Sequence, residues 1–312
     1  MKTGNLTTTR DRLALWMQQS STTMAQVARR TGYNEATISR YLASTMSGNR
    51  EAVESAITDM LNAHERRQTW HAFYFDTVGT QRAQTLFDLI RETCDIGLVT
   101  SPAGMGKTTA AQHYASTHES AILITLTEGH GDNWGIIRFL FDTLKVRNYN
   151  RQRHGTKDSV IHQRLAQSER LLIVDNAQRA TLSGLRWLFD LYDSTGIPIA
   201  LIGNPDILTR LAGSDQLSSR IGLRTDISHQ QGRHDIDWLI DAADTLLAEM
   251  WPNAPQEVQL LAREAVRQEG HLRRLVKQLR IAIRLSDAPA WAGKQAAAFV
   301  EARSLIGTPT LD

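Results

Sequence analysis

Four short runs of apolar residues in the middle of the chain have the length and continuity of buried β-strands. They lie at 96–99, 121–126, 171–175 and 197–204. Between them, apolar residues recur at helical spacing, for example in 81–93 and 134–146. Continuously apolar strands that alternate with amphipathic helices predict a parallel α/β sheet. In such sheets ligands bind at the carboxyl ends of the strands, so the polar residues found there are the first candidates for function.

The N-terminal part of the chain has a purely helical pattern. Residues 24–42 read as two short helices about a tight turn, in which Gly32 can end the first helix and Asn34 can cap the second. A longer amphipathic helix at 51–67 follows. The residues with the spacing of a buried face are Val27, Ala28, Ile38 and Leu42. We therefore predict an all-α helix-turn-helix domain over residues 1–69.

The C-terminal part is helical as well. Apolar periodicity predicts helices at 235–250, 255–269, 272–285 and 293–306. These helices would form a small lid domain over 231–312, which leaves 70–230 as the α/β core. The predicted fold class is an α/β core with an all-α domain before it and a helical lid after it.

Composition limits the setting more than the function. The chain has 312 residues, enough for two or three domains, and its net charge of +2 is too small to indicate nucleic acid by itself. The single cysteine, Cys94, excludes an intrachain disulfide framework. No apolar run reaches the length of a membrane span, and the N-terminus lacks a signal-peptide pattern. We expect a cytoplasmic protein with no membrane partner.

The first predicted strand leads into a phosphate-loop pattern, followed by a helix-forming segment. Glycines allow the backbone to approach a polyphosphate, and the N-terminus of the new helix offers unpaired N–H groups. Lys107 would reach the β- and γ-phosphates, and the hydroxyl of Thr108 would bind Mg²⁺. The predicted nucleotide-binding residues of this loop are Ser101, Gly104, Met105, Gly106, Lys107, Thr108 and Thr109. Ser101 stands where the pattern has its first glycine, next to Pro102, which favours a tight turn.

The later strands also end in polar residues. Asp175 follows the third strand and suits a second Mg²⁺ ligand. The next residue is Asn176, at a position where related ATPases carry a glutamate that polarises the attacking water. An amide cannot accept the proton of that water, so we predict slow turnover, with Glu128 as a possible substitute base. Asn204 ends the fourth strand, where it either senses the γ-phosphate or opens a turn with Pro205.

Two arginines outside the strands are candidates for contact with the nucleotide. Arg220 precedes the predicted fifth strand and could reach the nucleotide of a neighbouring subunit as an arginine finger, with Arg224 as second choice. Arg273 follows Gly270 in the predicted lid and could return to the nucleotide of its own chain. Ordinary surface arginines remain the alternative.

Basic residues cluster between the second and third strands. The five candidates for DNA contact there are Lys145, Arg147, Arg151, Arg153 and Lys157, with no acid among them. This composition favours contact with the phosphate backbone over a simply solvated loop. In the helix-turn-helix, Arg40 suits a guanine or a phosphate. A bundle for protein contacts is the alternative for that domain.

Taken together, these segments resemble the AAA+ ATPases of DNA transposition, in particular the phage Mu B protein group. The motifs that carry the resemblance, in order, are SPAGMGKTTAA (101–111), LLIVDNAQ (171–178), IPIALIGNP (197–205), LSSRIGLRT (217–225) and GHLRRLVKQLRIA (270–282). The resemblance implies an AAA+ core that binds ATP and Mg²⁺. It also implies an ATP-bound form that polymerises as a helical filament on double-stranded DNA without strong sequence preference, and that delivers this DNA to a transposase.

The resemblance also assigns roles to individual residues. It implies that Lys107, Thr108 and Asp175 bind Mg-ATP, that Asn204 and Arg273 are sensors, and that Arg220 is the finger. Two other functions remain open. One is a loader of a replicative helicase, and the other is a transcriptional regulator whose helix-turn-helix reads an operator while the core senses nucleotide. Sequence-specific DNA binding that persists without ATP would favour the regulator.

Overall fold

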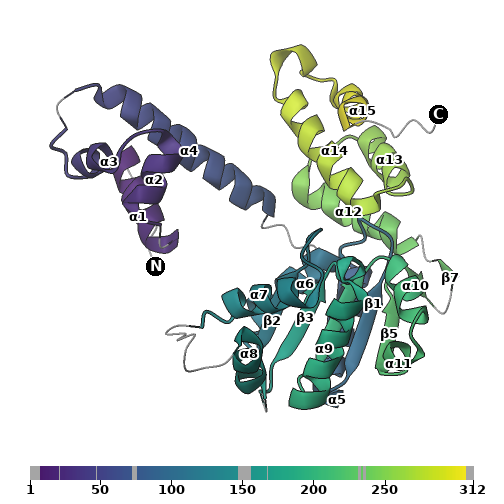
Figure 1. The fold of residues 1–312 in the computed structure, drawn as a ribbon. Coiled ribbons are helices and arrows are strands. Elements are labelled where there is room, and N and C mark those ends of the chain that lie inside the picture. The colour runs from purple at the N-terminus through teal and green to yellow at the C-terminus, as the bar shows by residue number, and fades with distance from the viewer. Residues whose placement is uncertain are drawn as a thin grey trace. The chain divides into compact units, whose positions relative to one another are not determined.

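The structure is a computed structural model of the full chain, and it describes residues 8–20, 22–46, 48–71, 76–146, 156–166, 168–230, 233–234 and 237–306. The chain divides into two compact units, Met1–Phe73 and Tyr74–Asp312 (Figure 1). Each unit has its own buried core and is described by itself.

The first unit is entirely helical. Its helices are α1 (Thr9–Ser20), α2 (Met24–Thr31), α3 (Glu35–Leu42) and α4 (Arg50–His71). The predicted turn is confirmed: Gly32 ends α2 with a φ of 78°, and Asn34 caps α3 by accepting the backbone N–H of Thr37 at 2.8 Å. The core includes Val27, Ala28 and Ile38, as predicted. Leu42 is only partly buried, and Tyr41 occupies the core position beside it.

The second unit contains a five-stranded parallel sheet. Its strands are β1 (Ile96–Thr100), β2 (Ala121–Thr125), β3 (Leu171–Asp175), β4 (Ile199–Gly203) and β5 (Ile221–Asp226), in the order β2-β3-β4-β1-β5. This confirms the predicted parallel sheet. The strands end in register, with Thr100 opposite Gly203 and Thr125 opposite Asp175, so their polar ends meet along one edge. One boundary was wrong: Arg224 lies within β5 rather than before it.

Helices cover both faces of this sheet. They are α5 (Val78–Thr93), α6 (Lys107–Thr117), α7 (Asn133–Thr143), α8 (Lys157–Leu165), α9 (Leu182–Thr195), α10 (Asp206–Ala212) and α11 (Asp215–Ser218), with a 3-10 turn, η1 (Ala177–Arg179). Helices α7, α8 and α9 share one hydrophobic core with alternate residues of the strands, such as Leu98, Leu172 and Leu201. Helices α5 and α6 pack against each other and against the sheet, outside that core.

Four further helices follow the sheet within the second unit. They are α12 (Asp237–Met250), α13 (Gln256–Ala265), α14 (His271–Ser286) and α15 (Gln295–Ile306), with a short 3-10 turn, η2 (Pro289–Trp291), before the last. A two-stranded ribbon of β6 (His229–Gln230) and β7 (Arg233–His234) precedes them. The predicted C-terminal helices are confirmed. The finer division of the chain at residues 69/70 and 230/231 stays a prediction.

Among the described helices, none is both long and apolar enough to cross a membrane.

Candidate nucleotide-binding site

The phosphate loop connects the end of β1 to the start of α6. Gly104 and Gly106 have φ angles of 89° and 92°, a conformation that glycine adopts without strain. Gly106 precedes the first residue of α6 and has no side chain that could bond the free N–H groups of the helix start. Those N–H groups and the positive end of the helix dipole form a site suited to phosphate. Met105, between the two glycines, is fully buried.

Lys107 is the first residue of α6, and its ammonium group lies inside the loop. Its Nζ donates to the carbonyl oxygens of Ser101 and Pro102 at 2.6 and 2.8 Å, and to the Oγ of Ser101 at 2.9 Å. The side chain is buried, and this burial lowers the pKa of Lys107 to about 8, although the nearby Asp175 favours the charged form. The ammonium group of Lys107 has therefore lost much of its hydration, and an anionic ligand bound in the loop would compensate for that loss.

Ser101 replaces the first glycine of the usual pattern, and the structure shows why the chain tolerates it. The residue is fully buried, and its N–H donates to the carbonyl of Gly203 at 3.4 Å. Its φ is not in the left-handed region, so no glycine is required there. Its hydroxyl adds a hydrogen bond to Lys107, so the serine contributes to the loop.

Thr108 and Asp175 form the oxygen-rich part of the site. The hydroxyl of Thr108 donates to the two carboxylate oxygens of Asp175 at 3.2 and 3.1 Å. Burial raises the pKa of Asp175, while the hydrogen bond from Thr108 and the positive charges of Lys107 and Arg273 oppose that rise. A hydroxyl and a carboxylate this close are hard oxygen ligands of the kind Mg²⁺ prefers, so the donor set fits a magnesium ion held together with substrate phosphates.

The neighbouring Asn176 has a backbone reason to be an asparagine. Its φ of 56° lies in the left-handed region, which asparagine tolerates better than glutamate does. Its side-chain amide donates to the carbonyl of Leu126 at 3.4 Å, which ties the ends of β3 and β2 together. Glu128, the predicted substitute base, lies exposed on the turn that follows β2. The structure therefore brings Asn176 next to Asp175, whereas Glu128 stands on a surface turn.

The end of β4 is fixed by a residue of η1. Gln178 accepts the backbone N–H of Asn204 at 3.3 Å through its Oε1. This contact joins Asn204, the predicted sensor, to the segment that carries Asp175. Asp175 ends β3, and Asn204 directly follows β4. These two strands pair directly and end on the side of the sheet where the phosphate loop begins.

The start of α14 docks directly onto the phosphate loop. A Cβ placed on Gly104 would collide with the carbonyl oxygen of Gly270, so the two backbones touch. The N–H of Arg273 donates to the carbonyl of Gly104 at 3.3 Å. The charge of Arg273 acts on the pKa of both Lys107 and Asp175, which places it at the same site. Sequence analysis identified Arg273 but missed the backbone contact, because two glycines 166 positions apart carry no pattern that links them.

Arg220 lies at the opposite end of the strands, where the amino ends of the parallel strands meet. It precedes the first residue of β5, and its Nη2 is 3.0 Å from Oδ2 of Asp193, near the end of α9. Because the strands are parallel, this end is opposite to the phosphate loop of the same chain. The structure therefore does not bring Arg220 together with Lys107, Thr108 and Asp175 of its own chain. Arg224, the second choice, donates from Nη2 to the carbonyl of Ser218 at 2.6 Å.

The predicted DNA contacts are only partly described. Lys145 is exposed, and the Nζ of Lys157 lies 4.7 Å from the ring centre of Phe141. The other three predicted contacts of this segment fall outside the described residues: Arg147, Arg151 and Arg153. In the first unit, Arg40 is exposed on α3 and donates to the carbonyl of Ala36 at 3.2 Å.

From the lowered pKa of Lys107 we predict that the affinity for a nucleotide depends on pH. In the described arrangement the lysine loses its proton above about pH 8, whereas bound phosphates would keep it charged. Binding then takes up a proton, so the affinity for Mg-ATP is expected to fall by up to about tenfold per pH unit above pH 8. Isothermal titration between pH 7 and pH 9.5 measures this. The Lys107→Met variant, as control, should bind weakly without that slope, and a flat affinity in the unmodified protein would contradict the assignment.

Comparison with known proteins agrees with this geometry. Residues 90–211 match the AAA domain family, a range that begins in α5 and ends in α10. The chain is 27% identical over 280 residues to the Mu-like prophage FluMu DNA transposition protein B of Haemophilus influenzae, covering 86% of this chain and 93% of that protein. It is 26% identical over 293 residues to the ATP-dependent target DNA activator B of Escherichia phage Mu, covering 89% and 88%.

Among solved structures, the Thermotoga maritima RuvB Holliday junction branch migration motor aligns with 72% of this chain and 68% of its own, with a TM-score of 0.44 and 14% identity. The residues that match the AAA domain family include four strands of the parallel sheet, β1 to β4, and the phosphate loop between β1 and α6. The chain is similar over nearly nine-tenths of its length to the transposition B proteins of phage Mu and a Mu-like prophage.

Proposed function

We propose that this protein is an ATP-dependent, largely sequence-nonspecific DNA-binding protein that assembles as a filament on double-stranded target DNA. In this role it delivers the DNA to a transposase and activates that enzyme, in the cytoplasm of a bacterial or phage-infected cell. The observation that carries the proposal is the convergence on one site of Lys107, of the Thr108–Asp175 pair and of the start of α14. The relatives support the DNA part, since one is named an ATP-dependent target DNA activator.

The nucleotide acts as a switch in this proposal. ATP with Mg²⁺ supplies the phosphate and metal charges that Lys107, Asp175 and Arg273 are arranged to meet. Because α14 contacts the phosphate loop through its backbone, a change at the phosphates can shift the C-terminal helices. Asn204 and Arg273 would sense the γ-phosphate, and Arg220 would act on the nucleotide of the neighbouring subunit. Assembly on DNA then places one subunit's finger at the next subunit's site.

DNA contact is assigned to five basic residues, which we call the basic series, with Arg40 of the helix-turn-helix as an auxiliary contact. The series consists of Lys145, Arg147, Arg151, Arg153 and Lys157. Lysines and arginines without interspersed acids bind phosphates through charge and carry no sequence information. This fits a protein that covers DNA of any sequence. The three middle arginines belong to the proposal on their sequence alone.

A second candidate function is a nucleotide-sensing transcriptional regulator. The observation that favours it is the helix-turn-helix of the first unit, in which α3 exposes Asn34, Glu35, Ser39 and Arg40. The acidic Glu35 on that face opposes close contact with phosphates, which is why this function ranks second. A helicase loader remains a third candidate, and no described contact favours it.

The proposal predicts DNA binding that depends on ATP. The full-length protein should coat a long random duplex in the presence of Mg-ATP, and bind it at least about tenfold more weakly with ADP or without nucleotide, a difference of about 1.4 kcal/mol. Fluorescence anisotropy and negative-stain microscopy measure this. Lys107→Ala should abolish the filaments, because the buried cation that meets the phosphates is removed. Binding that is indifferent to nucleotide or restricted to one DNA sequence would favour the regulator instead.

The proposal also predicts slow hydrolysis by the isolated protein. The amide of Asn176 cannot accept a proton from the attacking water, so steady-state turnover should lie well below about 1 s⁻¹, the low end for ordinary enzymes. A phosphate-release assay measures the rate, and the Lys107→Ala variant shows how much of it belongs to this site. A faster rate that disappears in Lys107→Ala would mean that another residue, such as Glu128, supplies the base.

A further inference from the structure

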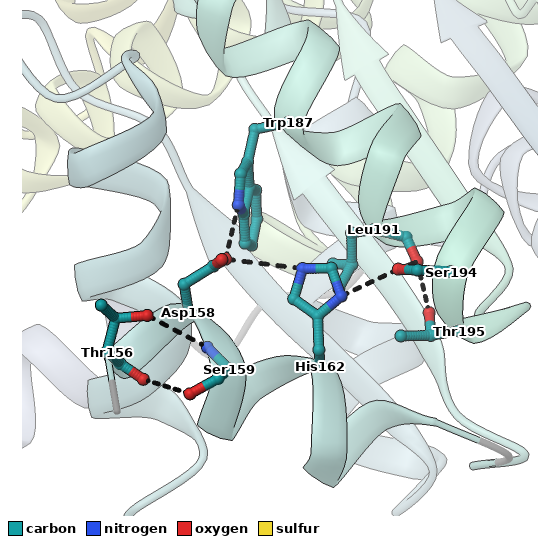
Figure 2. Close-up of polar contacts among 8 residues, drawn as sticks. All are labelled: Thr156, Asp158, Ser159, His162, Trp187, Leu191, Ser194 and Thr195. Atoms are coloured by element: carbon teal, nitrogen blue, oxygen red, sulfur yellow. Dashed lines mark hydrogen bonds and ion pairs between the residues drawn. The ribbon is translucent and has the colours of Figure 1, made fainter. Parts of the chain in front are cut away.

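A polar network joins α8 to α9 on the face of the sheet that these helices cover (Figure 2). The Nε2 of His162 is 3.4 Å from Oδ1 of Asp158, one turn earlier on α8, and its Nδ1 is 2.8 Å from the hydroxyl of Ser194 on α9. The Nε1 of Trp187 donates to the same oxygen of Asp158 at 2.7 Å. The indole and imidazole rings meet edge to face, with their centres 6.1 Å apart. His162 is thus bonded to both helices at once.

One end of this network lies at the start of α8. Thr156 caps the helix, since its hydroxyl accepts the N–H of Ser159 at 3.5 Å and its carbonyl accepts the Ser159 hydroxyl at 2.9 Å. The first residue of α8 is Lys157, the last of the five basic residues assigned to DNA contact. Asp158 follows it directly. The last residue of the basic series, Lys157, is therefore adjacent in the chain to the carboxylate that His162 contacts.

The other end of the network lies at the end of α9. The hydroxyls of Ser194 and Thr195 both donate to the carbonyl of Leu191, at 3.1 and 2.5 Å. Asp193, the residue before Ser194, forms the ion pair with Arg220. The end of α9 that His162 contacts is thus the end that positions the proposed finger.

The geometry of the serine indicates a holding role rather than nucleophilic chemistry. The Ser194 Oγ lies 2.8 Å from Nδ1 of His162 and 3.1 Å from the carbonyl oxygen of Leu191, so the hydroxyl is fixed between the imidazole and its own helix. The side chains of His162 and Asp158 remain 28% and 41% exposed. Partly exposed polar contacts contribute little to folding stability, so the network is better suited to positioning than to holding the core together.

We propose that His162 is a positioning residue that couples DNA contact to the arginine finger. Contact of DNA with Lys157 acts on the adjacent Asp158, and His162 and Ser194 transmit that constraint to Asp193, which orients Arg220 toward the nucleotide of the next subunit. This inference rests on the proposed function, because it needs both DNA contact and hydrolysis in trans. The inference predicts that DNA raises the rate of hydrolysis, and that part of this rise does not come from gathering subunits.

The test compares ATP hydrolysis by the full-length protein with and without a saturating random duplex. The variants are His162→Phe, which keeps a ring but removes both polar contacts, Ser194→Ala, and the two combined. The matched control is His118→Phe, which makes the same change at a part-buried histidine that stacks on Tyr114, away from the network. Anisotropy measures DNA affinity, and thermal unfolding checks that each variant folds. Ser194→Ala removes one hydroxyl only, so it remains informative if His162→Phe unfolds.

We expect DNA affinity and the rate without DNA to stay within about twofold of the unmodified protein, whereas the stimulation by DNA falls by about fivefold or more. The double variant should lose no more than the single variants, because both interrupt one route. His118→Phe should be stimulated normally. Full stimulation in His162→Phe or Ser194→Ala, or losses that add in the double variant, would overturn the inference alone. An unmodified protein that binds no DNA would overturn the proposed function and the inference with it.

Discussion

The contact between the phosphate loop and the start of α14 is the constraint on which the rest of this structure depends. Gly104 and Gly270 both adopt positive φ, and their backbones touch where any side chain on Gly104 would collide. This contact brings Arg273 to the site that Lys107 and Asp175 already form. The phosphate loop and the C-terminal helices are thereby joined backbone to backbone.

The site also concentrates charge where water is scarce. Burial disfavours the charged forms of both Lys107 and Asp175, although the two groups partly compensate each other. Such an arrangement costs folding free energy, which a phosphate–magnesium complex can offset by supplying the missing opposite charges. Desolvation thus makes the empty site costly to form. The binding free energy of a phosphate–magnesium complex would offset this cost, and it would stabilise one arrangement of α14 and the phosphate loop.

Much of the fold could be predicted from the sequence, because its information is local. Continuous apolar runs identified four of the five strands of the parallel sheet, and Gly32 and Asn34 identified the turn between α2 and α3. The strand-end residues Asp175 and Asn204 followed from the rule that such ends meet. Contacts between distant segments could not be predicted: the Gly104–Gly270 docking and the His162–Ser194 bond join residues whose spacing carries no periodicity. Arg224 was misplaced because β5 is only partly buried and lacks a continuous apolar run.

In the proposed assembly, ATP-bound subunits gather on DNA so that one subunit completes the site of the next. A cryo-electron microscopy reconstruction of the full-length protein with Mg-ATP on a long duplex would show whether this is so. We expect a continuous helical filament in which Arg220 of each subunit approaches the phosphates bound at Lys107 of its neighbour, while Lys157 at the start of α8 faces the DNA. Subunits that bind DNA separately, or a filament in which Arg220 faces solvent, would contradict it.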